Sequence, residues 1–156
     1  MTPTNNQPDP QDLFNLDRFI SAQQGVYDRV LAELRDGQKR SHWMWYVFPQ
    51  FQGLAQSNTS KYYAIKTREE AIAYLQHPVL GKRLRECTEA VINIEGKSVS
   101  EIFGYPDDLK LKSSMTLFSS VASDPLFDRV LEKYFQGEED EKTLQLLKKT
   151  DSSNPR

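Results

Sequence analysis

The chain has 156 residues, a formal net charge of −2 and a single cysteine. A chain of this length is expected to form one domain that buries roughly 70% of its surface, and one cysteine excludes an internal disulfide bond. The weakly acidic charge argues against nucleic acid as a partner, because nucleic-acid-binding domains are usually basic. No apolar run reaches the roughly 18 residues of a membrane-spanning helix and no secretory signal follows Met1, so we expect a cytoplasmic protein with no membrane partner.

Helices dominate the predicted elements. Residues 1–11 are polar and predict a disordered N-terminal tail, residues 150–156 predict a disordered C-terminal tail, and residues 12–149 predict a single helical domain. The first part of this domain forms two consecutive helices or one bent helix, over 12–24 and 27–36. Apolar spacing then predicts one short turn and further helices, over 43–47, 67–75, 78–95, 98–103, 106–122, 125–136 and from Asp140 onward.

Capping signals agree with these helical periods. The pairs Thr67–Glu70 and Ser98–Glu101 have the spacing of capping boxes, and His77 is expected to cap the helix that follows it. The polar segment 52–63 predicts a loop, and only residues 62–65 have a short strand-like character. The fold class is therefore all-α, a compact single domain of seven or eight short-to-medium helices.

The sequence contains no complete catalytic or cofactor motif. It has no glycine-rich phosphate loop, no G-x-S-x-G elbow, no H-E-x-x-H and no C-x-x-C. Because His42 and His77 are far apart and the only cysteine is elsewhere, we expect neither a metal site nor a cofactor. Cys87 lies on the apolar stripe of the helix over 78–95 and is expected to be a buried structural thiol rather than a nucleophile.

The stretch from Ser41 to Gln50 concentrates unusual residues, including both tryptophans. Core packing explains the aromatic residues without any ligand, because large rings contribute much of a protein core. Each indole N–H nevertheless needs a hydrogen-bond partner, and a histidine and an amide flank the two rings. The ligand-binding candidates in this stretch are His42, Trp43, Trp45 and Gln50.

A second polar stretch occupies the start of a predicted helix, over residues 108–116. Asp108, Lys112 and Thr116 are spaced four apart and share one helix face. An acid four residues before a base supports an exposed helix by a few tenths of a kcal/mol, which explains the spacing without a ligand. Several hydroxyls at adjacent helix positions conflict with helix propensity, however, and such conflicts often mark sites. The candidates here are Asp108, Lys112, Ser113, Ser114 and Thr116.

These two stretches also resemble a known family. The run from Ser41 to Gln50 is similar to the signature of a bacterial family catalogued as domain of unknown function 1810. Other segments fit the same family, at 62–65, 77–84, 112–118 and 134–137. The resemblance covers roughly residues 13–148. It implies a mainly α-helical single domain, with no established activity or catalytic residues to carry over.

These features support two hypotheses about function. In the first, the protein binds a small polar or nucleotide-like molecule in a cleft lined by residues 42–50 and 108–116, which requires Trp45 and Lys112 to face the same cleft. In the second, it is a non-enzymatic interaction module that docks a protein partner on the aromatic stretch. A simpler alternative is that both stretches only pack helices together. The sequence leaves open whether the protein is an enzyme and whether it forms oligomers.

Overall fold

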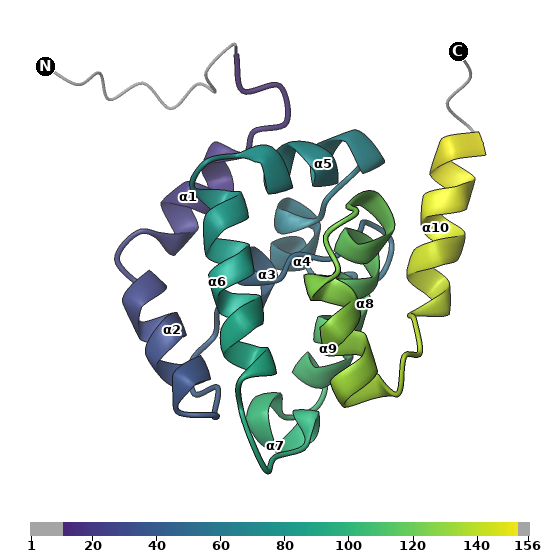
Figure 1. Ribbon diagram of the computed structural model, residues 1–156. Coiled ribbons are helices and arrows are strands. Elements are labelled where there is room, and N and C mark those ends of the chain that lie inside the picture. The colour runs from purple at the N-terminus through teal and green to yellow at the C-terminus, as the bar shows by residue number, and fades with distance from the viewer. Residues whose placement is uncertain (1–10, 153–156) are drawn as a thin grey trace, which may run out of the picture.

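Ten helices form within residues 11–152, the part of the chain that the computed structural model describes (Figure 1). The all-α prediction is confirmed, but the predicted number of seven or eight helices is too low. The helices are α1 (Asp17–Gln23), α2 (Tyr27–Arg35), α3 (Met44–Val47), α4 (Asn58–Tyr63), α5 (Arg68–Gln76), α6 (Leu80–Ile92), α7 (Val99–Phe103), α8 (Asp107–Val121), α9 (Leu126–Phe135) and α10 (Glu141–Ser152).

The segment 52–63, which we predicted as a loop, contains the helix α4. The side chain of Ser57 caps this helix by accepting a hydrogen bond of 3.1 Å from the backbone N–H of Ser60. A helix of six mostly polar residues has no apolar period that would reveal it in the sequence. The predicted strand character at 62–65 is reduced to a single parallel bridge between Phe51 and Ile65, and no strand occurs within residues 11–152.

The chain ends differ in part from the predicted boundaries. Helix α1 begins at Asp17, and α10 continues to Ser152, past the predicted boundary at residue 149. The rest of the two predicted tails, residues 1–10 and 153–156, lies outside the described residues. None of the helices between residues 11 and 152 is long and apolar enough to cross a membrane.

Helix α6 forms the centre of the core. It contacts α2, α5 and α9 and runs lengthwise between α2 and the α8–α9 pair (Figure 1). Its predicted apolar stripe is fully buried, with at most 1% exposure at Leu80, Leu84, Cys87 and Val91. Burial raises the pKa of Cys87 to about 12, so this thiol stays protonated, in agreement with the predicted structural role.

Three predicted caps have their expected partners at least in part. Ser98 and Glu101 form the complete reciprocal box. The Nδ1 atom of His77 accepts hydrogen bonds of 3.1 and 3.2 Å from two backbone N–H groups at the start of α6. Thr67 accepts a hydrogen bond of 3.0 Å from the N–H of Glu70, but the Glu70 carboxylate turns to other partners. The local sequence therefore predicts helix starts well, and tertiary contacts modify them.

Glycine allows α5 and α6 to approach closely where the two helices meet. A Cβ atom built at Gly81 would lie 2.1 Å from the carbonyl oxygen of Leu75. This oxygen belongs to the backbone and cannot move aside, so no other residue fits at this position.

The segment 50–66 turns back on itself and is closed by backbone hydrogen bonds. Ile65 donates its N–H to the carbonyl of Gln50 at 2.9 Å, and Gln52 donates its N–H to the carbonyl of Ile65 at 2.8 Å. Helix α4 lies between these two ends. The segment is thus a closed unit on the surface of the helical core rather than an open loop.

A buried ion pair fixes this segment to the rest of the fold. The Arg18 guanidinium, on α1, contacts the Glu70 carboxylate at 2.7 Å, and both side chains are 3% exposed. The same guanidinium donates hydrogen bonds to the carbonyl groups of Tyr62 at 2.8 Å and Ala64 at 3.0 Å. The second carboxylate oxygen of Glu70 accepts the backbone N–H of Lys66 at 2.9 Å. One ion pair therefore orients residues 62–66.

Candidate functional site

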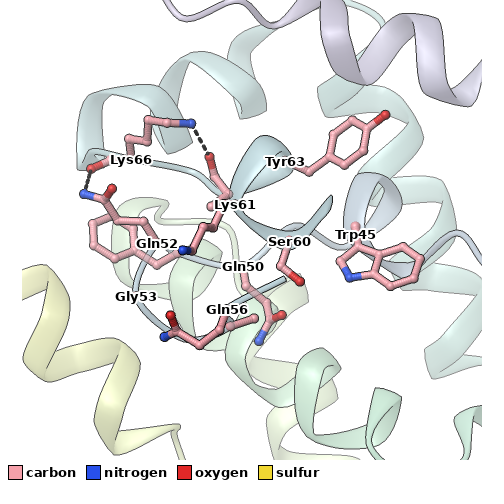
Figure 2. A pocket seen from close by; sticks show the side chains of 12 residues that line it. Trp45, Gln50, Gln52, Gly53, Gln56, Ser60, Lys61, Tyr63 and Lys66 are labelled. Carbon is pink, nitrogen blue, oxygen red and sulfur yellow. Dashed lines mark hydrogen bonds between the residues drawn. The ribbon is translucent and has the colours of Figure 1, made fainter. Parts of the chain in front are cut away.

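A cavity of about 290 Å³ lies between the turn of α3 and the segment 50–66 (Figure 2). Its apolar walls come from Trp45, Phe51, Ala55, Tyr63 and Ala64. Its polar walls come from Gln50, Gln52, Gln56, Ser60, Lys61 and Lys66. The cavity joins the aromatic stretch to a segment that we predicted as a loop.

Trp45 is the aromatic residue that the turn of α3 presents to the cavity. Its Nε1 atom is buried and has no hydrogen-bond partner within residues 11–152. Figure 2 shows the nitrogen-bearing edge of the indole turned toward Ser60 and Gln50. The Lys110 ammonium, on α8, lies 5.1 Å from the centre of the indole ring and attracts its π face. The ring is therefore held by the protein while its N–H remains without an acceptor.

Two amide side chains beside Trp45 are also unpaired. Gln50 and Gln56 make no side-chain hydrogen bond to the described residues and line the same cavity. The hydroxyl of Ser60 lies 2.6 Å from that of Ser57. An amide presents both donors and an acceptor, so these groups can recognise a polar ligand from several directions.

The cavity carries positive charge without negative charge. Lys61 and Lys66 line it, whereas none of the lining residues has a carboxylate. Neither lysine has a carboxylate within salt-bridge distance among residues 11–152. Burial, and then the neighbouring Arg18 charge, lowers the pKa of Lys66. The Glu70 carboxylate acts on Lys66 from behind the wall but is paired with Arg18, so an anion in the cavity would meet net attraction.

The wall of the cavity is braced from behind. Gln52 donates a side-chain hydrogen bond of 3.0 Å to the carbonyl of Lys66, and Lys66 donates one of 3.2 Å to the carbonyl of Ala64. Leu146 of α10 packs against Gly53, where an added Cβ would lie 3.2 Å from the leucine side chain. The C-terminal helix therefore supports the loop that forms one side of the cavity.

Trp43 has a different environment from Trp45. It is 1% exposed, and its Nε1 donates a hydrogen bond of 2.8 Å to Glu33 on α2. Glu33 also accepts the backbone N–H groups of Arg40 and Ser41, at 2.8 and 3.1 Å, and the hydroxyl of Ser41 at 2.5 Å. Burial alone would raise the pKa of Glu33, but these hydrogen bonds lower it to about 2. Trp43 is a core residue whose polar atom is satisfied inside the protein.

The candidates on α8 do not line the cavity. Asp108 accepts a hydrogen bond of 2.9 Å from Ser100, and Lys112 pairs with Glu138 in the loop before α10. Ser114 is completely buried, and its hydroxyl has no partner within residues 11–152. These side chains therefore face other helices rather than the segment 50–66.

The two remaining hydroxyls on α8 attach the last helix. Ser113 donates to the Asp140 carboxylate at 3.2 Å, and Thr116 accepts the backbone N–H of Asp140 at 2.9 Å. Asp140 in turn accepts the backbone N–H of Thr143 at 3.1 Å, which caps α10. The conflict with helix propensity at these positions thus has a structural cause.

Of the nine candidates, the structure brings only Trp45 and Gln50 to the cavity. His42 is exposed and does not line the cavity, and the others are buried or paired elsewhere. The lining residues that sequence reasoning missed lie in 52–66, chiefly Gln56, Ser60, Lys61 and Lys66. Their signal was a run of glutamines and lysines without acidic residues, which resembles an ordinary exposed loop.

Other places in the described structure offer less for a ligand. No group of three or more His, Cys, Asp or Glu residues within 11–152 could hold a metal ion. A second hollow of about 330 Å³, between α2 and α6, is lined by Arg35, Glu86, Glu89 and Asn93. Opposite charges face each other there, and Glu86 already accepts the hydroxyl of Tyr27 at 2.5 Å.

Comparison with known proteins identifies a family and a solved structure. The model of the family described as "Protein of unknown function (DUF1810)" matches residues 13–147. The chain is 53% identical to the conserved hypothetical protein Rv1873 from Mycobacterium tuberculosis, whose crystal structure superimposes with a TM-score of 0.87 over 88% of this chain and 99% of that chain. No match was found among curated proteins.

Proposed function

The chain belongs to the DUF1810 family, and we propose that it binds a small polar, nucleotide-like ligand in the cavity between Trp45 and the segment 50–66. The run from Ser41 to Gln50 predicted this family correctly. Because the family is described as having unknown function, the proposal depends on the chemistry of the cavity itself.

The observation that carries the proposal is the unpaired indole N–H of Trp45. A buried donor without an acceptor destabilises a fold by about 1–3 kcal/mol, and most buried polar groups have a partner. Here the indole edge that carries the donor is turned toward Ser60 and Gln50 at the cavity, and the Nε1 atom has almost no accessible surface, so a ligand acceptor reaches it when the ring shifts slightly. The amides of Gln50 and Gln56 beside it have no partner among the described side chains. A ligand that supplies acceptors would satisfy all of these groups at once.

The dimensions of the cavity suit a compact molecule. Its volume of about 290 Å³ lies at the small end of ligand sites, which span roughly 300–1,000 Å³. The rings of Trp45 and Tyr63 provide apolar contact area, and six polar side chains complete the lining. This combination favours a small ring-containing ligand with polar substituents.

The proposed cleft differs from the one that we expected from the sequence. The cation beside Trp45 is Lys110 rather than Lys112, and the opposite wall is the segment 50–66 rather than residues 108–116. Lys110 and Lys112 are two positions apart on α8 and point about 200° away from one another. Of the expected site, Trp45 and Gln50 line the cavity, whereas the expectation that Trp45 and Lys112 face the same cleft is wrong.

The alternative of a docking surface on the aromatic stretch is less well supported. Met44, Val47 and Phe48 are buried in the core together with Trp43. Only His42 is exposed, and Trp45 and Tyr46 are half-buried. A partner-binding patch normally offers several hundred Å² of contiguous apolar surface, and this stretch offers little.

Intrinsic fluorescence combined with thermal unfolding tests the proposal. The chain would be screened against nucleosides, nucleotides and sugar phosphates, and a ligand at 100 times its Kd should stabilise the fold by about 2.7 kcal/mol. Binding should also change tryptophan fluorescence, because the indole of Trp45 borders the cavity.

The fluorescence change should disappear in Trp45→Phe and persist in Lys112→Ala, a variant outside the cavity. A panel in which no compound raises the melting temperature or alters the fluorescence would contradict the proposal. Equal loss of binding in both variants would place the site elsewhere.

A further inference from the structure

The cavity has two chemically different ends. Trp45 and Gln50 lie at one end, and Lys61 and Lys66 lie on the side away from Trp45 (Figure 2). The first end offers an indole donor and an amide, which are uncharged. The second end offers two ammonium groups, of which that of Lys66 also donates a hydrogen bond to the carbonyl of Ala64. A ligand that fills the cavity should therefore have a neutral polar end and an anionic end.

The charge at the lysine end matches one phosphate group. Lys61 and Lys66 supply two positive charges, and no lining carboxylate opposes them. A phosphate monoester carries about −1.5 to −2 at pH 7, so the two ammonium groups neutralise it. Lysine acts on phosphate as a point charge, without the fixed geometry of an arginine fork.

The same end is unsuited to a magnesium-bound triphosphate. Such ligands are usually bound through one or two carboxylates that hold the magnesium ion beside the phosphates. No carboxylate lines this cavity, and no group of acidic, histidine or cysteine side chains in residues 11–152 could hold a metal. The volume of about 290 Å³ also leaves little room for a longer phosphate chain.

The uncharged end is suited to the edge of a heterocycle. The indole N–H of Trp45 can only donate, whereas the Gln50 amide can donate and accept. Neither group has a competing side-chain partner within residues 11–152. A nucleobase edge that carries an acceptor next to a donor would pair with both.

We propose that the ligand is a nucleoside monophosphate bound without a metal ion, with its base edge at Trp45 and Gln50 and its phosphate between Lys61 and Lys66. This inference rests on the proposed function and adds the ligand class, its orientation and its independence of metal. Lys61 and Lys66 bind the phosphate, and Trp45 and Gln50 select the base.

Calorimetric titration of the full chain would compare four kinds of compound for each base. These are the nucleoside, its 5′-monophosphate, its triphosphate with magnesium, and ribose 5-phosphate without a base. The bases adenine, guanine, cytosine and uracil would each be tested. We expect one monophosphate to bind at least 10-fold more tightly than its nucleoside, its magnesium triphosphate or ribose 5-phosphate, with an affinity that EDTA does not change.

Charge-neutralising variants assign the phosphate end. In the double variant Lys61→Gln and Lys66→Gln, we expect the monophosphate to lose its advantage while the nucleoside keeps its affinity. Lys142→Gln is the matched control, because Lys142 is exposed on α10 and does not line the cavity. Both replaced lysines are exposed, so folding should be kept, and circular dichroism with the melting temperature would verify it.

The outcomes separate this inference from the proposed function. A nucleoside that binds as tightly as its monophosphate would overturn the phosphate assignment and leave the binding cavity in place. Tighter binding of the magnesium triphosphate would overturn the inference that the ligand is a monophosphate bound without a metal ion. Binding of ribose 5-phosphate at full strength would overturn the base assignment. If no probe binds, the proposed function itself falls.

Discussion

Two tryptophans separated by one residue occupy opposite kinds of environment. Trp43 is enclosed in the core, and Glu33 accepts its N–H. Trp45 is half-buried, and its N–H faces a cavity without an acceptor. The comparison shows that the number of aromatic residues does not distinguish core from site. The partner of each polar atom does.

The short helix α3 produces this difference. Trp43 is the N-cap residue of α3, with non-helical backbone angles (φ −138°, ψ 8°), and its indole reaches Glu33 on α2. Trp45 lies within the turn itself, and its indole reaches the cavity beside the segment 50–66. Met44 and Val47 fill the space between and anchor the turn in the core. A single turn therefore links the stability of the fold to the geometry of the cavity.

The largest expected contrast comes from replacing each tryptophan by alanine. Trp43→Ala should lower the free energy of unfolding by about 3–5 kcal/mol, because it opens a large cavity in the core. Trp45→Ala should lower it by about 1–2 kcal/mol and should abolish ligand binding. Urea denaturation measures both, and equal losses of stability would contradict the distinction.

The wall of the cavity can be weakened without changing either tryptophan. Arg18→Leu leaves the Glu70 carboxylate buried and unpaired, which should lower stability by about 3–5 kcal/mol. The backbone N–H of Ile65, which donates to Gln50, should then exchange with solvent faster. The double variant Arg18→Leu and Glu70→Leu should recover most of the stability, because no unpaired charge remains. No recovery would mean that the hydrogen bonds of Arg18 to the backbone dominate.

Acid should remove the stability that the Glu33 carboxylate contributes by accepting hydrogen bonds from Trp43 and its neighbours. The pKa of Glu33 is about 2, below its ordinary value of 4.5, so its contribution is complete above about pH 4.5 and is lost as the pH falls toward 2. The shift corresponds to roughly 3 kcal/mol. Denaturation at several pH values should show this loss in the native chain and a smaller one in Glu33→Gln. Glu132→Gln, at an exposed position of α9, should respond to acid as the native chain does.

The smallest change replaces an indole by a phenyl ring, which removes the N–H group together with part of the ring. Trp45→Phe should alter the free energy of unfolding by less than about 1 kcal/mol, because removal of the unpaired buried donor offsets the apolar contact that is lost with the smaller ring. Trp43→Phe should lower it by about 1–3 kcal/mol, because Glu33 loses a hydrogen bond in a buried place. A large destabilisation in Trp45→Phe would show that its N–H has an acceptor in solution.

Local signals in the sequence predicted much of the fold. The apolar stripe of α6 and the caps at Ser98 and His77 depend on neighbouring residues, and these predictions are confirmed. Helix α4 was missed because its six residues are mostly polar and its position depends on the bridge between Phe51 and Ile65. The two residues of that bridge are far apart in the sequence, and hydrophobic periodicity reports only on near neighbours.

The site was less predictable because its polar atoms have distant partners. The indole N–H of Trp43 donates to Glu33, which lies ten residues earlier on α2. The hydroxyl of Thr116 accepts the backbone N–H of Asp140, 24 residues later. Composition marked all these residues as unusual, but only the tertiary contacts separate the polar atoms that have partners from those of Trp45 and Ser114, which have none within residues 11–152. Lys61 and Lys66 lacked any distinguishing local pattern.

The single cysteine gives this protein a natural reporter of its own opening. Cys87 is fully buried, and its pKa is about 12, whereas thiol reagents attack the accessible thiolate. Labelling should therefore proceed only through molecules in which α6 has separated from its neighbours. The labelling rate then measures how often the core opens, and a bound ligand should slow it in proportion to its occupancy. Mass spectrometry of one alkylated site would follow both quantities in the unmodified chain.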